Sequence, residues 1–334
     1  MRIAVVGATG LVGREMLAVL AERGFGHEDI IVAASPRSVG KELVFADRKL
    51  TVVSVDDAIA ARPRYAIFSA GAAASREYAP RFVSVGTTVI DNSSAWRKDP
   101  KVPLVVPEVN IDTAITAIRQ SDNRAIIIAN PNCSTIQMVL ALSALQREYG
   151  LRRLVIATYQ SITGTGIKAV RQLEAEEQGT APAEPAYPYP IHRNLFPHGG
   201  DFLPDGYTTE EQKLVDETRK IYADPTIAIT ATVVRVPVVG GHSEAVNAEL
   251  RRDYDLADVR RLIADTPGVI LYDDPASARY PMPMLAHHRD EVWVGRLRRD
   301  PSQPRSLNLW VVADNIRKGA ATNAIQIMQT LIAQ

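Results

Sequence analysis

The sequence lacks three features that are typical of particular protein classes. Cys133 is its only cysteine in 334 residues, which excludes an internal disulfide and a metal site built from several cysteines. Neither sign of charge is in excess, since Lys+Arg and Asp+Glu are both 38. This balance argues against nucleic acid or an anionic membrane as the main partner and leaves room only for a local basic pocket that binds a small anion.

Long apolar runs are also missing, because no stretch approaches the roughly 18 residues that suggest a spanning helix. The N-terminal stretch "MRIAVVGATG" reaches a glycine turn too early for a signal peptide. We therefore expect a soluble, cytoplasmic protein with no membrane partner and no metal site. The length suggests about two domains.

Short apolar runs alternate with helical or loop segments in the first 130 residues, which predicts a parallel sheet with helices on both faces. The expected strands cover residues 2–6, 29–35, 65–70, 87–93 and 124–130. After a helix at 135–150, the pattern changes to strands at short spacings, which favours a mostly antiparallel sheet. These strands cover 151–162, 227–239, 245–252, 291–300 and 306–314, with helices expected at 209–222 and 319–334. Residues 179–207 hold six prolines and predict a long irregular segment.

The first strand and helix are joined by "GATGLVG", which places Gly7, Gly10 and Gly13 at equal spacing. Glycines let the backbone turn sharply and approach a pyrophosphate, and the helix N-terminus then offers N–H groups to the phosphates. The spacing is a variant of the commoner G-x-G-x-x-G pattern, and a tight turn without a ligand is the alternative. The position after an N-terminal strand favours a dinucleotide.

The second expected strand is followed by "SPRS", where an NAD-binding protein usually has an acidic residue. Ser35, Arg37 and Ser38 suit a 2′-phosphate, so the sequence favours NADP. The alternative for Arg37 is a solvated loop arginine.

Cys133 lies in "NPNCST", at a predicted junction between a strand and a helix. A thiolate at a helix N-terminus is stabilised by the helix dipole and by N–H groups, which lowers the pKa of the thiol. On composition alone, a nucleophile and a small buried core residue are equally good interpretations. The stretch "RVPVVGGHSE" favours the nucleophile, because His242 there could pair with the thiol. The alternative for His242 is a structural histidine, and the other five histidines lie in loop-like surroundings.

With these motifs, the chain closely resembles the bacterial type of aspartate-β-semialdehyde dehydrogenase. The matching stretches run in order from "VVGATGLVG" through "DNSSAWR", "ANPNCST", "TYQSITGTG", "GYTTEEQK" and "RVPVVGGHSE" to "ADNIRKGAATNA". The resemblance implies that L-aspartyl-4-phosphate is reduced by NADPH to L-aspartate-4-semialdehyde and phosphate through a cysteine thioester. The product would supply lysine, diaminopimelate, methionine and threonine synthesis.

The resemblance also implies a role for each matching residue. Cys133 would be the nucleophile, His242 the general acid/base, and Gln160 would orient the bound intermediate. Arg235 would hold the substrate carboxylate and Glu210 its ammonium group, while Arg97, Asn132 and Lys213 would bind phosphate. Exposed helix or loop side chains are the alternatives for Glu210, Lys213 and Arg97. The cofactor would contact the residues Gly7, Thr9, Gly10, Leu11, Val12, Gly13, Ser35, Arg37, Ser38, Thr163, Gly164 and Asn315.

The implied architecture is an α/β chain with an NADP-binding, Rossmann-like parallel-sheet domain over residues 1–130, completed by a C-terminal helix at 314–334. An α+β catalytic and dimerisation domain would cover 131–313, so a homodimer is expected. Three rival functions are an N-acetyl-γ-glutamyl-phosphate reductase, a non-catalytic dinucleotide-binding paralogue and a thiol redox sensor. Glu210 argues against the first, because an acid that binds a free ammonium has no partner in an N-acetyl group. The presence of both Cys133 and His242 argues against the second, and the lack of a resolving cysteine argues against the third.

Overall fold

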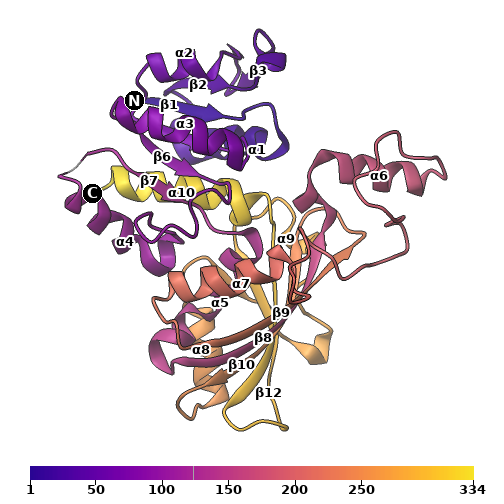
Figure 1. Cartoon of the computed structure of the whole chain (residues 1–334). Coiled ribbons are helices and arrows are strands. Elements are labelled where there is room, and N and C mark those ends of the chain that lie inside the picture. The colour runs from indigo at the N-terminus through magenta and orange to yellow at the C-terminus, as the bar shows by residue number, and fades with distance from the viewer. Residues whose placement is uncertain (123) are drawn as a thin grey trace. The chain divides into compact units, whose positions relative to one another are not determined.

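A computed structural model describes residues 1–122 and 124–334 (Figure 1). The chain forms two compact units. The first unit combines Met1–Asn132 with Ala320–Gln334, and the second is Cys133–Gly319. The boundaries expected from the sequence were at residues 130 and 314, so the second unit begins and ends slightly later than expected. Cys133 is the first residue of this unit and Gly319 the last.

The first unit contains a five-stranded parallel sheet with the order β2-β1-β5-β6-β7, as the alternating pattern predicted. Its strands are β1 (Arg2–Val6), β2 (Asp29–Ala33), β5 (Tyr65–Phe68), β6 (Thr88–Asp91) and β7 (Ile127–Ala129). Its helices are α1 (Leu11–Leu20), α2 (Val55–Ala60), α3 (Ala72–Ser84), α4 (Pro107–Gln120) and α10 (Thr322–Ile332), with a π-helical turn at Ala21–Phe25 and a 3₁₀ turn at Pro36–Ser38.

Both faces of this sheet are buried, which explains why its strands are continuously apolar. Ile3 and Val5 of β1 belong to a core shared with residues of α1, α4 and α10. The alternate residues Ala4 and Val6 belong to a second core shared with residues of α2 and α3. The C-terminal helix α10 is therefore part of the core of the first unit.

A two-stranded hairpin of β3 (Glu42–Phe45) and β4 (Arg48–Thr51) was not predicted from the sequence. Its turn places Ala46 and Asp47 at positive φ, where a glycine or asparagine would have been the usual signal. Leu43 and Phe45 are buried in the core beside α1, and Val44 is exposed.

The second unit contains a six-stranded mixed sheet with the order β11-β12-β13-β10-β8-β9. Its strands are β8 (Leu151–Ser161), β9 (Ala228–Val236), β10 (His242–Leu250), β11 (Val269–Leu271), β12 (Val292–Arg299) and β13 (Ser306–Ala313). The central pairs are antiparallel, as expected, whereas β8 pairs with β9 and β11 with β12 in parallel. The expected strand after "GHSE" begins earlier than predicted, so His242 is its first residue.

Helices α5 (Cys133–Glu148), α7 (Thr209–Ile221) and α8 (Leu256–Ala264) pack on this sheet (Figure 1). Helix α5 contacts β8, β10, β12 and β13, and residues 134–145 are all buried. Helices α6 (Ile167–Glu177) and α9 (Pro283–Ala286) and short helical turns at Ile162–Thr165, Pro275–Ser277 and Arg317–Ala321 complete the unit. Residues 179–207 contain only turns, bends and isolated bridges, as their proline content predicted.

Candidate active site

The loop between β1 and α1 depends on two of its three glycines. Gly7 has a φ of +87°, and a Cβ on it would lie 2.4 Å from the carbonyl oxygen of Ser69. A Cβ on Gly13 would lie 2.2 Å from the carbonyl oxygen of Gly7. Gly10 is the N-cap residue of α1, and a Cβ there would meet only an ordinary contact at 3.4 Å. The tight turn places the N-terminus of α1 beside the carboxyl-terminal end of β1. The first N–H groups of α1 have no partner within the helix.

The loop after β2 lies beside this glycine turn. Thr9 Oγ1 donates a long hydrogen bond of 3.5 Å to Ser38 Oγ, which joins the two loops. Ser38 is buried, whereas Ser35 and Arg37 are exposed. Within the described residues, Arg37 has no hydrogen-bond or ion-pair partner. The guanidinium thus remains available to an anion that reaches this edge of the first unit.

Two asparagines connect the segments that carry Arg97 and Asn132 in the first unit. Asn130 Nδ2 donates to Asn92 Oδ1 at 2.7 Å, and Asn323 Nδ2 donates to Asn130 Oδ1 at 2.7 Å. Arg97 Nη2 donates to the carbonyl oxygen of Asn92 at 2.9 Å. Arg97 and Asn132 are both buried, so the interpretation of Arg97 as a solvated loop residue is wrong.

Cys133 is half-buried and forms the N-terminal residue of α5, as the junction predicted. The next residue fixes this helix end to β8, because Gln160 Nε2 donates to Ser134 Oγ at 2.8 Å. Gln160 Oε1 is buried and has no hydrogen-bond partner among the described residues. Gly319 packs directly on Cys133, because a Cβ on Gly319 would lie 2.8 Å from Cys133 Cβ.

His242 is fully buried at the start of β10. Its Nδ1 accepts the Ser161 N–H at 3.0 Å, so the neutral imidazole carries its proton on Nε2. Within the described residues, Nε2 has no hydrogen-bond partner. Burial lowers the pKa of His242 to about 3, Arg235 adds to the decrease and Glu210 opposes it. His242 is therefore a neutral hydrogen-bond donor at physiological pH.

Arg235 and Glu210 lie close enough to His242 to act on its pKa. Arg235 is a buried residue of β9, and its Nη1 donates to the carbonyl oxygen of Ser161 at 3.0 Å. Gly164 lies against both groups, because a Cβ there would be 2.7 Å from Arg235 Nη1 and 3.3 Å from His242 Nε2. The chain can pass this close to the site only with glycine at position 164.

Helix α7 begins with a capping box that places Glu210 in its first turn. The Thr208 hydroxyl accepts the Glu211 N–H at 3.3 Å, and Glu211 Oε2 accepts the Thr208 N–H at 2.7 Å. Glu211 Oε1 also accepts the Val233 N–H of β9, which ties the helix start to the strand that carries Arg235. Glu210 pairs with Lys213 at 2.8 Å, which is the i,i+3 contact considered as an alternative, but Glu210 is buried.

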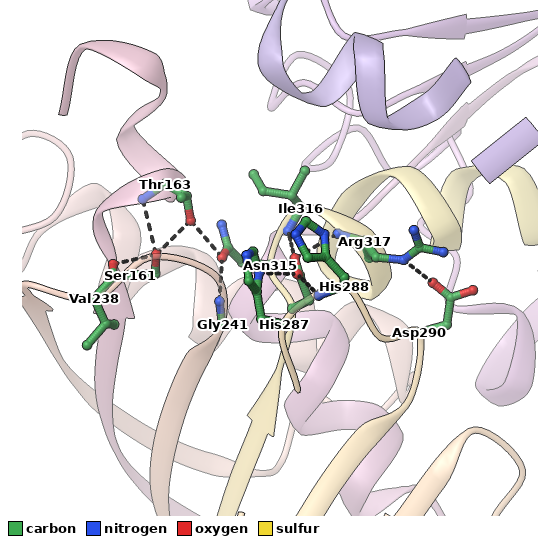
Figure 2. Close-up of polar contacts among 11 residues, drawn as sticks. Ser161, Thr163, Val238, Gly241, His287, His288, Asp290, Asn315, Ile316 and Arg317 are labelled. Carbon is green, nitrogen blue, oxygen red and sulfur yellow. Dashed lines mark hydrogen bonds and ion pairs between the residues drawn. The ribbon is translucent and has the colours of Figure 1, made fainter. Parts of the chain in front are cut away.

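A polar network surrounds Asn315 (Figure 2). Asn315 Oδ1 accepts hydrogen bonds from Thr163 Oγ1 at 2.9 Å and from the Gly241 N–H at 3.2 Å. Asn315 Nδ2 is buried and has no hydrogen-bond partner within the described part of the chain. The network brings the "ITGTG", "GGHSE" and "ADNIRKGAA" segments together in the second unit.

His287 contacts the same region, although the sequence gave it no distinguishing signal. Its Nδ1 lies 3.1 Å from Asp314 Oδ2, and a Cβ on Gly240 would overlap its ring. His287, His288 and Asp314 offer possible metal-ligand atoms within 4.8 Å of one another. However, both carboxylate oxygens of Asp314 already accept backbone N–H groups, from His288 and from the turn at Ile316 and Arg317. This cluster has the contacts of a structural turn.

Within the second unit, the structure assembles a cysteine at a helix N-terminus, a neutral histidine, a buried arginine and a buried acid. Such a set can attack an acyl group, donate to an oxyanion and bind a carboxylate and an ammonium group. The predicted residues Arg97 and Asn132 and the glycine loop belong to the first unit. Sequence reasoning missed Gly319, for which the only signal was its place in "RKGAA".

Comparison with known proteins gives consistent results along the chain. Residues 2–117 match the family described as semialdehyde dehydrogenase, NAD binding domain, and residues 142–318 match semialdehyde dehydrogenase, dimerisation domain. The chain is 46% identical over 339 residues to an aspartate-semialdehyde dehydrogenase of Aquifex aeolicus, with 100% of this chain and 98% of the relative covered. A relative of the same name from Legionella pneumophila is 47% identical over 336 residues, with 99% and 95% covered.

Among solved structures, the chain is similar to aspartate semialdehyde dehydrogenase II from Vibrio cholerae, crystallised in complex with ASA. The TM-score is 0.94 at 41% identity, and the match covers 100% of this chain and 98% of that one. None of the helices in the described residues is long and apolar enough to span a membrane.

Proposed function

Because the chain belongs to the aspartate-semialdehyde dehydrogenase family, we propose that it reduces L-aspartyl-4-phosphate to L-aspartate-4-semialdehyde and phosphate through a thioester on Cys133. Family membership makes the chain an enzyme of amino-acid biosynthesis with aspartate-semialdehyde dehydrogenase activity. The observation that carries the proposed chemistry is the position of Cys133 at the N-terminus of the buried helix α5. The proposed location is the cytoplasm, where enzymes of this biosynthetic family act.

The first chemical step is the attack of the Cys133 thiolate on the acyl carbon. A sulfur–carbon bond forms, the bond from carbon to the phosphate oxygen breaks, and phosphate leaves with its electron pair. The dipole of α5 stabilises the thiolate without requiring a neighbouring base. Covalent capture divides one difficult displacement into two easier steps, because a thioester accepts hydride more readily than a carboxylate.

His242 acts in this scheme first as an acid, because its Nε2 carries the proton. The Nε2–H group donates to the negative oxygen that develops when the acyl carbon becomes tetrahedral. When the tetrahedral hemithioacetal collapses, its hydroxyl proton returns to His242, the sulfur–carbon bond breaks, the aldehyde is released and the thiolate is restored. Gln160, held against Ser134 by its amide nitrogen, would orient the same carbonyl group.

Substrate recognition is assigned to the charged groups around His242. The Arg235 guanidinium suits the α-carboxylate, since its planar N–H donors can bind two oxygens at once. Glu210 suits the α-ammonium group, and Lys213 joins Arg97 and Asn132 in the proposed recognition of phosphate. A bound carboxylate would neutralise Arg235, so the pKa of His242 is expected to rise when substrate binds.

NADP is the proposed cofactor, and its reduced form, NADPH, would supply the hydride that reduces the thioester. The close approach of Gly7 and Gly13 to the backbone suits the pyrophosphate, together with Thr9, Gly10, Leu11 and Val12 at the start of α1. Arg37, exposed and without a protein partner in the described residues, suits a 2′-phosphate beside Ser35 and Ser38. The proposed nicotinamide contacts are Thr163, Gly164 and Asn315, whose unpaired Nδ2 is a ready donor.

A homodimer is the proposed assembly, formed through the second unit, whose sequence matches a dimerisation domain. The sheet face away from α5 carries Tyr159 and Trp310, whose ring centroids are 5.4 Å apart. A neighbouring groove of about 510 Å³ is lined by the segment Tyr280–Pro283 and by Ala245, Arg296, Arg298, Leu309 and Trp310. A half-exposed aromatic face of this kind fits a second copy of the chain.

The proposed function is tested by phosphate-dependent reduction of NADP with L-aspartate-4-semialdehyde. The N-acetyl-γ-glutamate semialdehyde analogue, run in parallel, tests the rival reductase. We expect activity with the first substrate that requires phosphate and little with the second, because Glu210 has no partner in an acetylated amine. Equal activity with both substrates would show that Glu210 does not bind the ammonium group.

A further inference from the structure

Glu244 is a fully buried carboxyl group that the proposed mechanism does not use. It follows His242 by two residues in β10, and both side chains lie on the buried face of this strand together with Val246 and Ala248. Within the described residues, neither carboxyl oxygen of Glu244 has a hydrogen bond of acceptable geometry. A buried acid without a partner carries a large desolvation cost, so its surroundings need explanation.

Two further buried side chains lie next to Glu244, and each has one polar atom without a partner among the described residues. Thr158 is its cross-strand neighbour on β8, and the Thr158 hydroxyl has no hydrogen bond among the described residues. Gln137 of α5 lies close enough to Glu244 to act on its pKa, and Gln137 Oε1 is likewise unpaired. Gln137 Nε2 does have a partner, since it donates to the carbonyl oxygen of His242 at 3.2 Å.

A single proton on Glu244 satisfies this group of polar atoms. A carboxylic acid both donates and accepts hydrogen bonds, so a protonated Glu244 can pair with the Thr158 hydroxyl and with the Gln137 amide. Burial raises the pKa of Glu244 well above its ordinary value, and the Gln137 side chain opposes this increase only in part.

Among the residues that the structure describes, no ionisable group around Glu244 offers a compensating cation. Strand β13, which faces it through Val311, has no ionisable side chain. On α5 the ionisable residues are confined to the two ends, and Arg152 and Arg153 of β8 are exposed near the far end of that strand. The remaining neighbour is His242, which is itself neutral.

The position of Gln137 connects this group to the nucleophile. Gln137 follows Cys133 by four residues, which is about one helical turn, so the two lie on the same side of α5. Its amide bonds to His242 on β10 and lies beside Glu244 of the same strand. We propose that Glu244 and Gln137 form a buried acid–amide pair that positions Cys133, at the start of α5, relative to His242, at the start of β10. This inference rests on the proposed function, in which Cys133 and His242 act on the same acyl group.

Glu244→Gln and Glu244→Met test the pair. Glutamine keeps a neutral group that can accept from and donate to the Gln137 amide, whereas methionine has a similar length and no hydrogen-bonding amide. Glu249→Gln is the matched control, because Glu249 is another buried acid of β10 but pairs with Arg152 at 3.1 Å. The readouts are kcat, the KM for substrate, and the rate at which iodoacetamide alkylates Cys133, which needs no substrate.

We expect Glu244→Gln and the control to keep kcat and alkylation within about twofold of wild type. Glu244→Met should lower kcat about tenfold or more with little change in KM, since displacement of a reacting group by a fraction of an ångström is costly. Its alkylation rate should change as well, which a loss of stability alone would not cause. Wild-type kcat and alkylation in Glu244→Met, or equal defects in both Glu244 variants, would overturn the proposal.

If Glu244→Met does not fold, infrared spectroscopy of the wild type and Glu244→Gln decides the matter. The carbonyl stretch of a protonated carboxyl group should persist above neutral pH in the wild type and be missing in Glu244→Gln. Absence of that band from the wild type would overturn the proposal. A failure of the proposed function would look different, because the band and the alkylation pattern would be present in a protein with no phosphate-dependent activity.

Discussion

A methyl group at Gly319 would overlap Cys133, the proposed nucleophile, and the size of the expected defect follows from the geometry. In Gly319→Ala, the new Cβ would lie 2.8 Å from Cys133 Cβ and 3.3 Å from Cys133 Cα. Carbon atoms in favourable contact are about 3.5–4.0 Å apart, so the two residues must separate by about 1 Å. The φ of Gly319 lies outside the left-handed region, so the alanine backbone itself is unstrained and the effect is steric.

A shift of about 1 Å in a reacting group can cost about a hundredfold in rate. We therefore expect Gly319→Ala to lower kcat by about ten- to a hundredfold, while NADP affinity, measured by fluorescence titration, changes little. Gly26→Ala is the control, since its φ is −55° and its Cβ would meet only Ala46 at 3.4 Å. A Gly319→Ala enzyme with wild-type kcat and wild-type alkylation of Cys133 would refute the close packing of Gly319 on the nucleophile.

Four further substitutions test separate parts of the account. Cys133→Ser should abolish turnover while NADP still binds, because an alkoxide is far scarcer than a thiolate at neutral pH; turnover near the wild-type rate would rule out the thioester. Arg37→Ala should weaken NADP by about 1.5–3 kcal/mol and NAD much less, and equal losses in two titrations would show that Arg37 does not bind the 2′-phosphate. Arg235→Lys should lower kcat/KM for the aspartyl substrate strongly despite the preserved charge, and an equal defect on an acyl substrate without an α-carboxylate would assign Arg235 a structural role. Glu244→Gln should gain stability relative to wild type as pH rises above the ordinary value of 4.5, by about 1.4 kcal/mol per pH unit until the raised pKa is reached. The reason is that native Glu244 keeps a proton that the unfolded chain releases, so thermal melts whose difference is independent of pH would contradict a protonated Glu244.

The sequence was most informative where local pattern and global fold agree. The continuous apolar strands of the first unit predicted a sheet buried on both faces, and the four apolar residues of β1, Ile3 to Val6, alternate between two cores. The turn formers around Cys133 predicted a strand-to-helix junction, and Cys133 begins α5. Both signals reside in a few consecutive residues, so they can be identified without knowledge of the tertiary contacts.

The features that escaped prediction depend on residues far apart in the chain. Gly319 contacts Cys133, although the two residues are the last and the first of the second unit in sequence. Gly164 contacts Arg235 and His242 from the segment between β8 and α6. The parallel pairing of β8 with β9 could not be inferred from strand spacing, because the long connection between them includes the irregular segment 179–207. Glu244 belongs to the quoted motif "GHSE", but only its burial and the unpaired polar atoms beside it indicate a positioning role.

The central claim is that an acyl group is carried on Cys133, and the mass of the protein tests it most directly. The enzyme is mixed with L-aspartyl-4-phosphate in the absence of cofactor, quenched in acid and measured by intact-protein mass spectrometry. The account predicts one added aspartyl group per chain, located on Cys133 by peptide mapping and released by hydroxylamine. An active enzyme that gains no such mass, or that carries the aspartyl group on another residue, would contradict it.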